Sequence, residues 1–184
     1  AGVAGLVVEE LQSRSGQISQ AHQQILTRLQ ETSSSAEEVV QMKAYLQSCD
    51  AEMATLQSGI DQELKGRLSL LEKFQFSLPD DAFSHVFNTI GWPARVHRMV
   101  SAAATRQEED RMLFMDQLRQ DRDTFAEELE RWESDIKGLN SLSDIAEVDT
   151  NAATVTALQT KLDEAKERAQ LYNSREALFG WEMT

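Results

Sequence analysis

The side chains of this chain that could take part in catalysis or metal binding include three histidines, one of which follows an acidic residue at helical spacing. His22, His85 and His97 lie far apart, and none of them belongs to a His-Glu-x-x-His or Glu-x-x-His spacing, which would bring two metal ligands to one helix face. Asp81 precedes His85 by four residues, so the two side chains could meet on a helix. Because no nucleophile or second ligand accompanies them, a surface hydrogen bond is the simpler interpretation, and we predict no metal site.

The acidic residues, the glycines and the cysteine also lack the sequence context that catalysis or nucleotide binding requires. The acidic run Glu108-Glu109-Asp110 lacks the apolar neighbours that would make one carboxyl an acid and the next a base. No glycine-rich loop of the G-x-x-x-x-G-K-S/T type is present to hold a nucleotide phosphate. Cys49 is the only cysteine and falls on an apolar helix stripe, where it is best explained as a core residue. We therefore predict no catalytic residue and no cofactor in this segment.

The elements that would position these side chains are predicted to be long helices. The 184 residues are 41% hydrophobic and 27% charged, with only eight glycines and two prolines. Apolar residues recur every three or four positions over most of the chain, which keeps them on one face of a helix. We expect an all-α fold, an elongated antiparallel bundle of about four long helices plus one short helix.

A central helix organises this predicted bundle. Its apolar stripe repeats at the heptad spacing, so it needs a partner helix along its length. We assign seven residues to the structural seam, the first on the second long helix and the others on the central helix: Phe74, Phe114, Leu118, Phe125, Leu129, Trp132 and Ile136. In the preceding helix the stripe shifts near Gly59 and Gly66, which favours a local change of winding there.

Polar breaks and prolines divide the chain into segments of one continuous bundle. These are residues 1–78, the first two long helices; 79–92, a short helix and a Trp-Pro corner; 93–140, the central helix; and 141–184, the last helix. Since the chain begins at Ala1 without a methionine, we expect it to be a piece of a longer polypeptide.

The corner before the central helix is rich in aromatic residues. Phe83, Phe87 and Trp92 lie within ten residues and are followed by Pro93, which suits a first helical turn. We expect these side chains to plug the end of the bundle. An exposed anchor for a partner protein is the alternative.

The charge of the chain restricts its partners. A net charge of −13 disfavours nucleic acid and anionic membranes as direct partners, because both are polyanions. No apolar run is long enough to span a bilayer, and no signal peptide is recognisable, so we predict a cytosolic protein. The acidic face of the central helix keeps it soluble or, alternatively, docks a basic partner.

Four motifs, in a fixed order, connect the chain to a known family. They are Leu70-Leu71-Glu72-Lys73-Phe74, Ile90-Gly91-Trp92-Pro93, Leu118-x-x-Asp121-Arg122-x-x-Phe125-x-x-x-Leu129 and Tyr172-Asn173-Ser174-Arg175-Glu176-Ala177-Leu178-Phe179-Gly180. From about Leu68 to Thr184 the chain resembles an axonemal dynein heavy chain, in the tail where helical bundles run into the motor's linker. The first sixty residues match only as heptad helix, and Tyr172 stands where phenylalanine is common.

The resemblance implies a role rather than a local chemistry. Dynein heavy chains are minus-end-directed microtubule motors, and the axonemal forms drive ciliary and flagellar beating. The resemblance implies that the ATP and Mg²⁺ sites lie in AAA+ modules outside this segment. The chain would be a non-catalytic tail or neck segment in the axoneme, a rigid strut between the cargo-bound tail and the linker. Its partners would be the remainder of the same heavy chain, intermediate or light chains, or another heavy chain. The alternative is a spectrin-like or tethering coiled-coil scaffold without a motor, which the heptads fit equally well.

The last motif would form the junction with the linker. Its residues are Asn173, Arg175, Glu176, Leu178, Phe179 and Gly180. We expect Leu178 and Phe179 to dock this end onto the first linker helices, and Gly180 to let the chain leave the helix. An ordinary hydrophobic helix end is the alternative.

Overall fold

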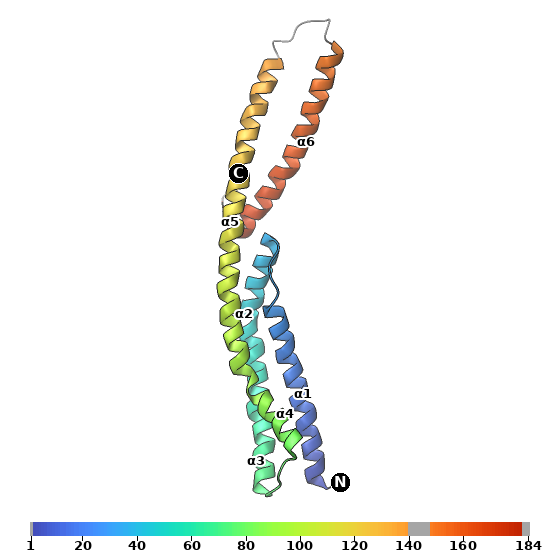
Figure 1. Cartoon of the computed structure of the whole chain (residues 1–184), viewed down its shortest axis with the longest axis vertical. Helices are drawn as coiled ribbons and strands as arrows, with labels where there is room; N and C mark the ends of the chain where they lie inside the picture. Colours follow the sequence, from blue (N-terminus) through green and yellow to red (C-terminus); the bar gives the residue numbers. More distant parts are fainter. Residues whose placement is uncertain (1, 140–147, 182–184) are drawn as a thin grey trace. The chain divides into compact units, whose positions relative to one another are not determined.

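The computed structural model describes residues 2–139 and 148–181, and every regular element in these ranges is a helix. The elements are α1 (Val3–Leu29), α2 (Ala36–Ser58), the π-helix η1 (Gly59–Leu64), α3 (Lys65–Lys73), α4 (Asp80–Ile90), α5 (Trp92–Leu139) and α6 (Val148–Phe179) (Figure 1). Since α2, η1 and α3 follow one another without a break, the described ranges hold four long helical stretches and one short helix. The predicted all-α fold is confirmed.

The chain divides into two compact units. The first contains Ala1–Ser34 and Gln41–Glu109, and the second contains Ser35–Val40 and Asp110–Thr184. Both α2 and α5 therefore contribute residues to both units. The division into units falls inside these two helices, whereas the sequence was divided at residues 78, 92 and 140.

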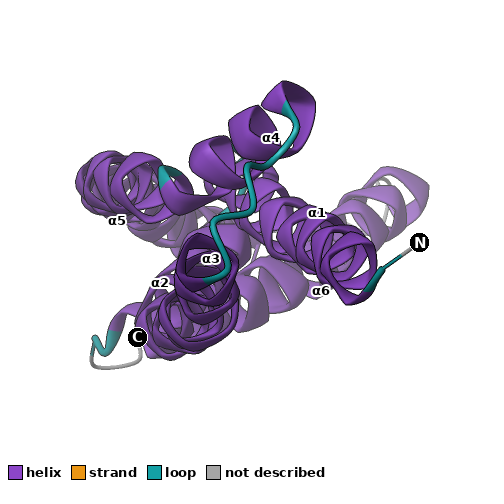
Figure 2. Cartoon of the chain, turned by 90° about the horizontal axis from the view of Figure 1, so that it is seen from below, coloured by secondary structure: helices purple, strands orange, loops and turns teal. Residues whose placement is uncertain are grey.

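In the first unit, α1 runs antiparallel to the stretch formed by α2, η1 and α3. Arg14 pairs with Glu63 at 2.7 Å, and Glu10, nearer the start of α1, pairs with Arg67 at 2.7 Å. Helix α4 packs against α1 and η1, and Figure 2 shows it beside α1 and α3 in the view from the end where α1 begins. These contacts make the first unit an antiparallel bundle.

Three clusters of apolar side chains form the core of this unit; the smallest consists of Val8, Leu71 and Ala82. Of the two larger clusters, one consists of Leu11, Ile18, Ile60, Leu64 and Val86, and the second of Ile25, Leu29, Cys49, Val96 and Ala103. The members contributed by α1 follow its heptad stripe, so the pattern in the sequence is also the pattern of burial. Burying one such aliphatic side chain contributes about 1.5 to 3 kcal/mol.

The stripe shift predicted near Gly59 takes the form of the π-helix η1. A π-helix has more residues per turn than an α-helix, so it rotates the apolar stripe of the helix that follows it. A Cβ at Gly59 would lie 3.4 Å from Cδ1 of Ile18, so glycine permits a close approach of η1 to α1.

In the second unit, α5 and α6 are antiparallel. Arg122 pairs with Glu176, and Glu128, further along α5, pairs with Arg168, which comes earlier in α6. The first turn of α2 completes this unit. Ser35 caps that turn by accepting a hydrogen bond from the amide of Glu38 at 3.2 Å.

Candidate functional site

The seam between α5 and α6 is centred on Phe125. Leu118 and Phe125 are buried, and the Phe125 ring meets Tyr172 edge-on, with centroids 5.5 Å apart. The guanidinium of Arg168 lies 4.8 Å from the ring centroid of Phe125 and 5.9 Å from that of Trp132. The seam is therefore aromatic and cationic as well as aliphatic.

Towards the end of α5 the seam opens, which corrects two of the predicted positions. Phe114 and Trp132 are half-buried, but Leu129 and Ile136 are 39% and 38% exposed. Val155 of α6 is exposed as well. Two helices cover each other only along a narrow line, so apolar residues at the margin of the stripe stay accessible without a third helix.

Phe74 was also assigned to the seam, but it lies in the first unit and is 75% exposed. Helix α3 ends at Lys73, and Gln75 adopts a positive φ of 51°. The amide of Phe76 then donates to the carbonyl of Leu71 at 3.0 Å, and that of Gln75 donates to Glu72 at 2.9 Å. This pair of bonds is a Schellman ending, which turns the chain out of the helix at Phe74.

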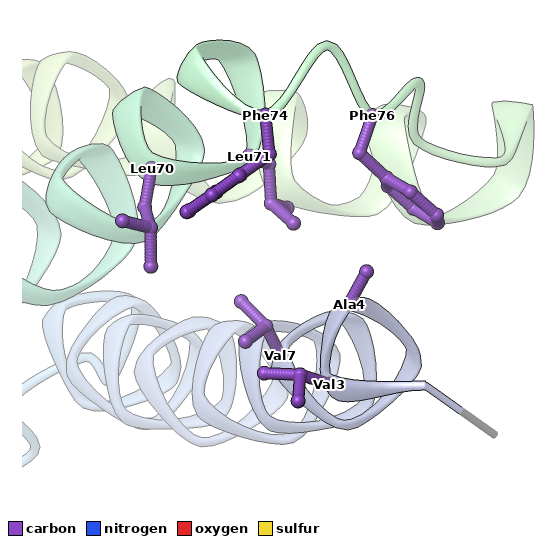
Figure 3. A pocket seen from close by; sticks show the side chains of 7 residues that line it. All are labelled: Val3, Ala4, Val7, Leu70, Leu71, Phe74 and Phe76. Carbon is purple, nitrogen blue, oxygen red and sulfur yellow. The ribbon is translucent and has the colours of Figure 1, made fainter.

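Phe74 instead lines an apolar groove between the start of α1 and the end of α3 (Figure 3). The groove has a volume of about 250 Å³ and is lined by Val3, Ala4, Val7, Leu70, Leu71, Phe74 and Phe76. None of these side chains can donate or accept a proton. The groove offers apolar surface and no catalytic group.

The aromatic corner separates into a packed part and an exposed part. Trp92 and Pro93 are half-buried at the start of α5, and the guanidinium of Arg95 lies 5.0 Å from the Trp92 ring. Phe83 and Phe87 stack on each other, with centroids 6.0 Å apart, and are 56% and 65% exposed. The prediction that all three aromatics plug the bundle is therefore wrong for these two phenylalanines.

The reason is the orientation of α4. This helix buries Ala82, Val86 and Thr89, which repeat at spacings of four and three. Phe83 and Phe87 fall between these positions and so lie on a different face. Such a pair of exposed aromatic rings is the kind of surface that the alternative interpretation of the corner, a partner anchor, requires.

Polar side chains buried on α1 form a part of the structure that was not foreseen. His22 is fully buried; its Nδ1 donates to the carbonyl of Ile18 at 2.8 Å, and its Nε2 has no hydrogen-bond partner. Burial lowers the pKa of His22, while the Ile18 carbonyl and the charge of Glu52 act in the opposite direction. The imidazole is therefore neutral at pH 7.

A cluster of three hydroxyls joins α1 to α4. Oγ1 of Thr89 lies 2.6 Å from Oγ of Ser15 and 2.7 Å from Oγ of Ser19. Thr89 also donates its single hydroxyl proton to the carbonyl of His85 at 2.9 Å. Its two lone pairs are then available to accept hydrogen bonds from both serines. The signal was present in the sequence, because Ser15 and His22 continue the stripe of Leu11 and Ile18 at spacings of four and three.

The end of α6 carries two ion pairs to other helices of the second unit. Glu176 is 0% exposed, and Arg122 of α5 lies 3.3 Å from its carboxylate. Arg175, the preceding residue, pairs at 3.6 Å with Glu37 in the first turn of α2. Arg122 and Glu37 were not among the predicted site residues. Arg122 could have been found, because it lies four residues after Leu118 on the buried stripe, where a charge needs a partner.

Helix α6 ends in the manner expected of Gly180. This residue has a φ of 73°; the amide of Trp181 donates to the carbonyl of Glu176 at 2.9 Å, and that of Gly180 donates to Ala177 at 3.2 Å. The Trp181 ring lies under the guanidinium of Arg119, 5.5 Å from its centroid. Asn173 and Phe179 are half-buried, and Leu178 is partly exposed.

The part of the chain that the structure describes contains neither a metal-binding cluster nor a membrane-spanning helix. No three side chains of His, Cys, Asp or Glu in residues 2–139 and 148–181 approach closely enough to hold a metal ion. No helix of those residues combines the length and apolar character needed to cross a membrane.

Comparison with known proteins supports the resemblance. No family model matches the sequence. The chain is similar to mouse dynein axonemal heavy chain 1 (21% identity over 179 residues, 97% of this chain), to the human protein of that name (20% over 182 residues, 99%) and to the rat protein (25% over 115 residues, 62%). It spans only about 4% of the mouse and human proteins. The resemblance to axonemal dynein heavy chains is confirmed as a sequence similarity over nearly the whole chain.

Proposed function

We propose that this chain is a non-catalytic segment from the tail or neck of an axonemal dynein heavy chain, a minus-end-directed microtubule motor of cilia and flagella. The observation that carries this proposal is the similarity to dynein axonemal heavy chain 1 over 97% to 99% of the chain. The segment connects the cargo-bound tail to the linker of the AAA+ motor. ATP and Mg²⁺ are bound elsewhere in the heavy chain.

The packing of the helices suits a mechanical role. Protein interiors are close-packed and barely compressible, so a helical bundle resists deformation by a force applied at its end. Helix α5 continues through 48 residues from the first compact unit into the second. A displacement at one end of this helix is therefore passed along a continuous hydrogen-bonded element rather than through a loop.

The exposed side chains offer places for partners. The stacked pair of Phe83 and Phe87 provides aromatic surface for an accessory chain or for a second heavy chain. Within the same heavy chain, the end of α6 at Leu178 and Phe179 faces the linker. The location is the axoneme of a cilium or flagellum.

The test is to insert a short flexible Gly-Ser linker into α5 at Glu109, in the intact heavy chain. We expect ATP hydrolysis to be retained and the velocity of microtubule gliding to fall several-fold, because the motor then pulls against a compliant element. The same insertion between α1 and α2, after Ser33, is the control and should leave gliding unchanged. Unchanged gliding in the α5 variant contradicts the strut, and a full-length protein that does not hydrolyse ATP supports the tethering scaffold instead.

A further inference from the structure

We propose that Arg175 and Glu176 fix the end of α6 to both of the helices that the two compact units share. We call Arg175, Glu176 and their partners Glu37 and Arg122 the α6 clamp. The clamp is a set of positioning residues, and its use in passing force from the linker rests on the proposed function.

Glu176 is the buried half of the clamp. Its carboxylate is 0% exposed and lies 3.3 Å from Nη1 of Arg122. A carboxylate withdrawn from water is unfavourable unless it is paired, so α6 is best accommodated in the register that brings Glu176 to Arg122. An apolar residue at this position could slide along the seam without such a penalty. The charge therefore specifies one alignment of α6 on α5.

Arg175 directs the second contact to a different helix. Consecutive residues of an α-helix point about 100° apart, so neighbours can face two partners. Nε of Arg175 lies 3.6 Å from the carboxylate of Glu37, in the first turn of α2. The short sequence Arg-Glu thus reaches α2 with one side chain and α5 with the other.

Both partner helices continue into the first unit. Ser35 and the first five residues of α2, up to Val40, belong to the second unit, while α2 from Gln41 onward belongs to the first. Helix α5 changes units between Glu109 and Asp110. The clamp therefore acts on each helix through which the chain passes from one unit to the other.

The position of the clamp is also the position where the chain leaves α6. The carbonyl of Glu176 accepts a hydrogen bond from the amide of Trp181 at 2.9 Å, and Gly180 provides the positive φ at this end of α6. Trp181 is held in turn by the guanidinium of Arg119 on α5. A change in the position of Glu176 would therefore alter the direction in which the polypeptide continues.

Amide hydrogen exchange on the 184-residue chain tests the clamp directly. In Glu176→Gln we expect the amides of Gly180 and Trp181 to exchange about tenfold faster or more, since the ending loses its fixed partner. In Arg175→Gln we expect the same acceleration for Glu38 to Val40 of α2. Glu127→Gln is the matched control, because Glu127 forms an exposed pair with Arg131 on α5. Its exchange should equal that of the wild type.

Three outcomes overturn the clamp. They are acceleration of less than about twofold in Glu176→Gln, faster exchange throughout both units instead of at these sites, or no change in α2 with Arg175→Gln. If Glu176→Gln does not fold, Glu37→Gln replaces it; this variant must match Arg175→Gln, and the double variant must add nothing further. These exchange rates are independent of motor activity. The clamp can therefore fail while the flexible insertion in α5 still supports the strut, and the strut can fail while the exchange rates still support the clamp.

Discussion

The imidazole of His22 stacks on the indole of Trp92, with ring centroids 6.1 Å apart and planes inclined by 12°. This contact joins the last third of α1 to the first residue of α5. Because His22 is fully buried and one of its nitrogens has no partner, the contact depends on a neutral imidazole.

The first prediction is a loss of stability in mild acid. The pKa of His22 is lowered in the folded chain, chiefly by burial, and takes its ordinary value of about 6.5 in the unfolded chain. Above that value neither state binds the proton, and the stability is fully present. As the pH falls below it, the unfolded chain is protonated first, so the free energy of unfolding falls by at most about 1.4 kcal/mol per pH unit until the folded pKa is reached.

Urea denaturation at about pH 7.5 and about pH 5 measures this effect. His22→Leu removes the titrating group and should lose less stability between the two pH values than the wild type. His97→Gln, which changes an exposed histidine, should behave as the wild type does. An equal loss in His22→Leu and the wild type would show that other groups cause the acid sensitivity.

The second prediction concerns the two Schellman endings. Gln75 and Gly180 occupy the same position in them, with φ values of 51° and 73°. Glycine adopts this conformation without the steric cost that a side chain incurs, so Gln75→Gly should raise the free energy of unfolding by about 0.5 to 1 kcal/mol. The shift of the thermal or urea midpoint measures it.

The converse change provides the control. Gly180→Ala introduces a Cβ at a positive φ and should destabilise by about 1 kcal/mol, although no atom lies within 4 Å of the added methyl group. If both variants shift the midpoint in the same direction, backbone conformation does not determine these helix ends.

The helices could be predicted from the sequence because the heptad stripe and the burial pattern coincide. Leu11, Ile18 and Ile25 are seven residues apart and all buried in the first unit. The stripe shift near Gly59 likewise marked a real change of winding. Local periodicity was sufficient for these features, since each requires only the next turn of the same helix.

The candidate site was harder to predict, because periodicity does not show which face of a helix has a partner. Leu118 and Leu129 belong to one stripe, yet the first is buried and the second is not. Phe74 was misplaced because the sequence does not reveal that α3 ends one residue earlier. Arg122, Glu37 and Thr89 were missed because a polar residue on a stripe becomes meaningful only when its partner, far away in the sequence, is known.

The third prediction uses this difference within the α5 stripe. Leu118→Ala should cost about 2 to 4 kcal/mol, because it empties a closely packed position. Leu129→Ala should cost less than about 1 kcal/mol, because that side chain already contacts water. Chemical denaturation of the two variants compares identical substitutions on one helix. Equal losses would mean that Leu129 is covered in solution.

The fourth prediction concerns the hydroxyl cluster between α1 and α4. Thr89→Val keeps the shape of the side chain but removes the oxygen that lies 2.6 Å from Oγ of the buried Ser15. Ser15 is then left without this partner, so the variant should lose about 1 to 3 kcal/mol. In the double variant Ser15→Ala with Thr89→Val no orphaned hydroxyl remains at Ser15, and the loss should be smaller than the sum of the two single losses by at least about 0.5 kcal/mol. Urea denaturation of the four proteins measures this coupling. Strict additivity would show that the two hydroxyls do not depend on each other, and that α4 is held to α1 by its apolar residues alone.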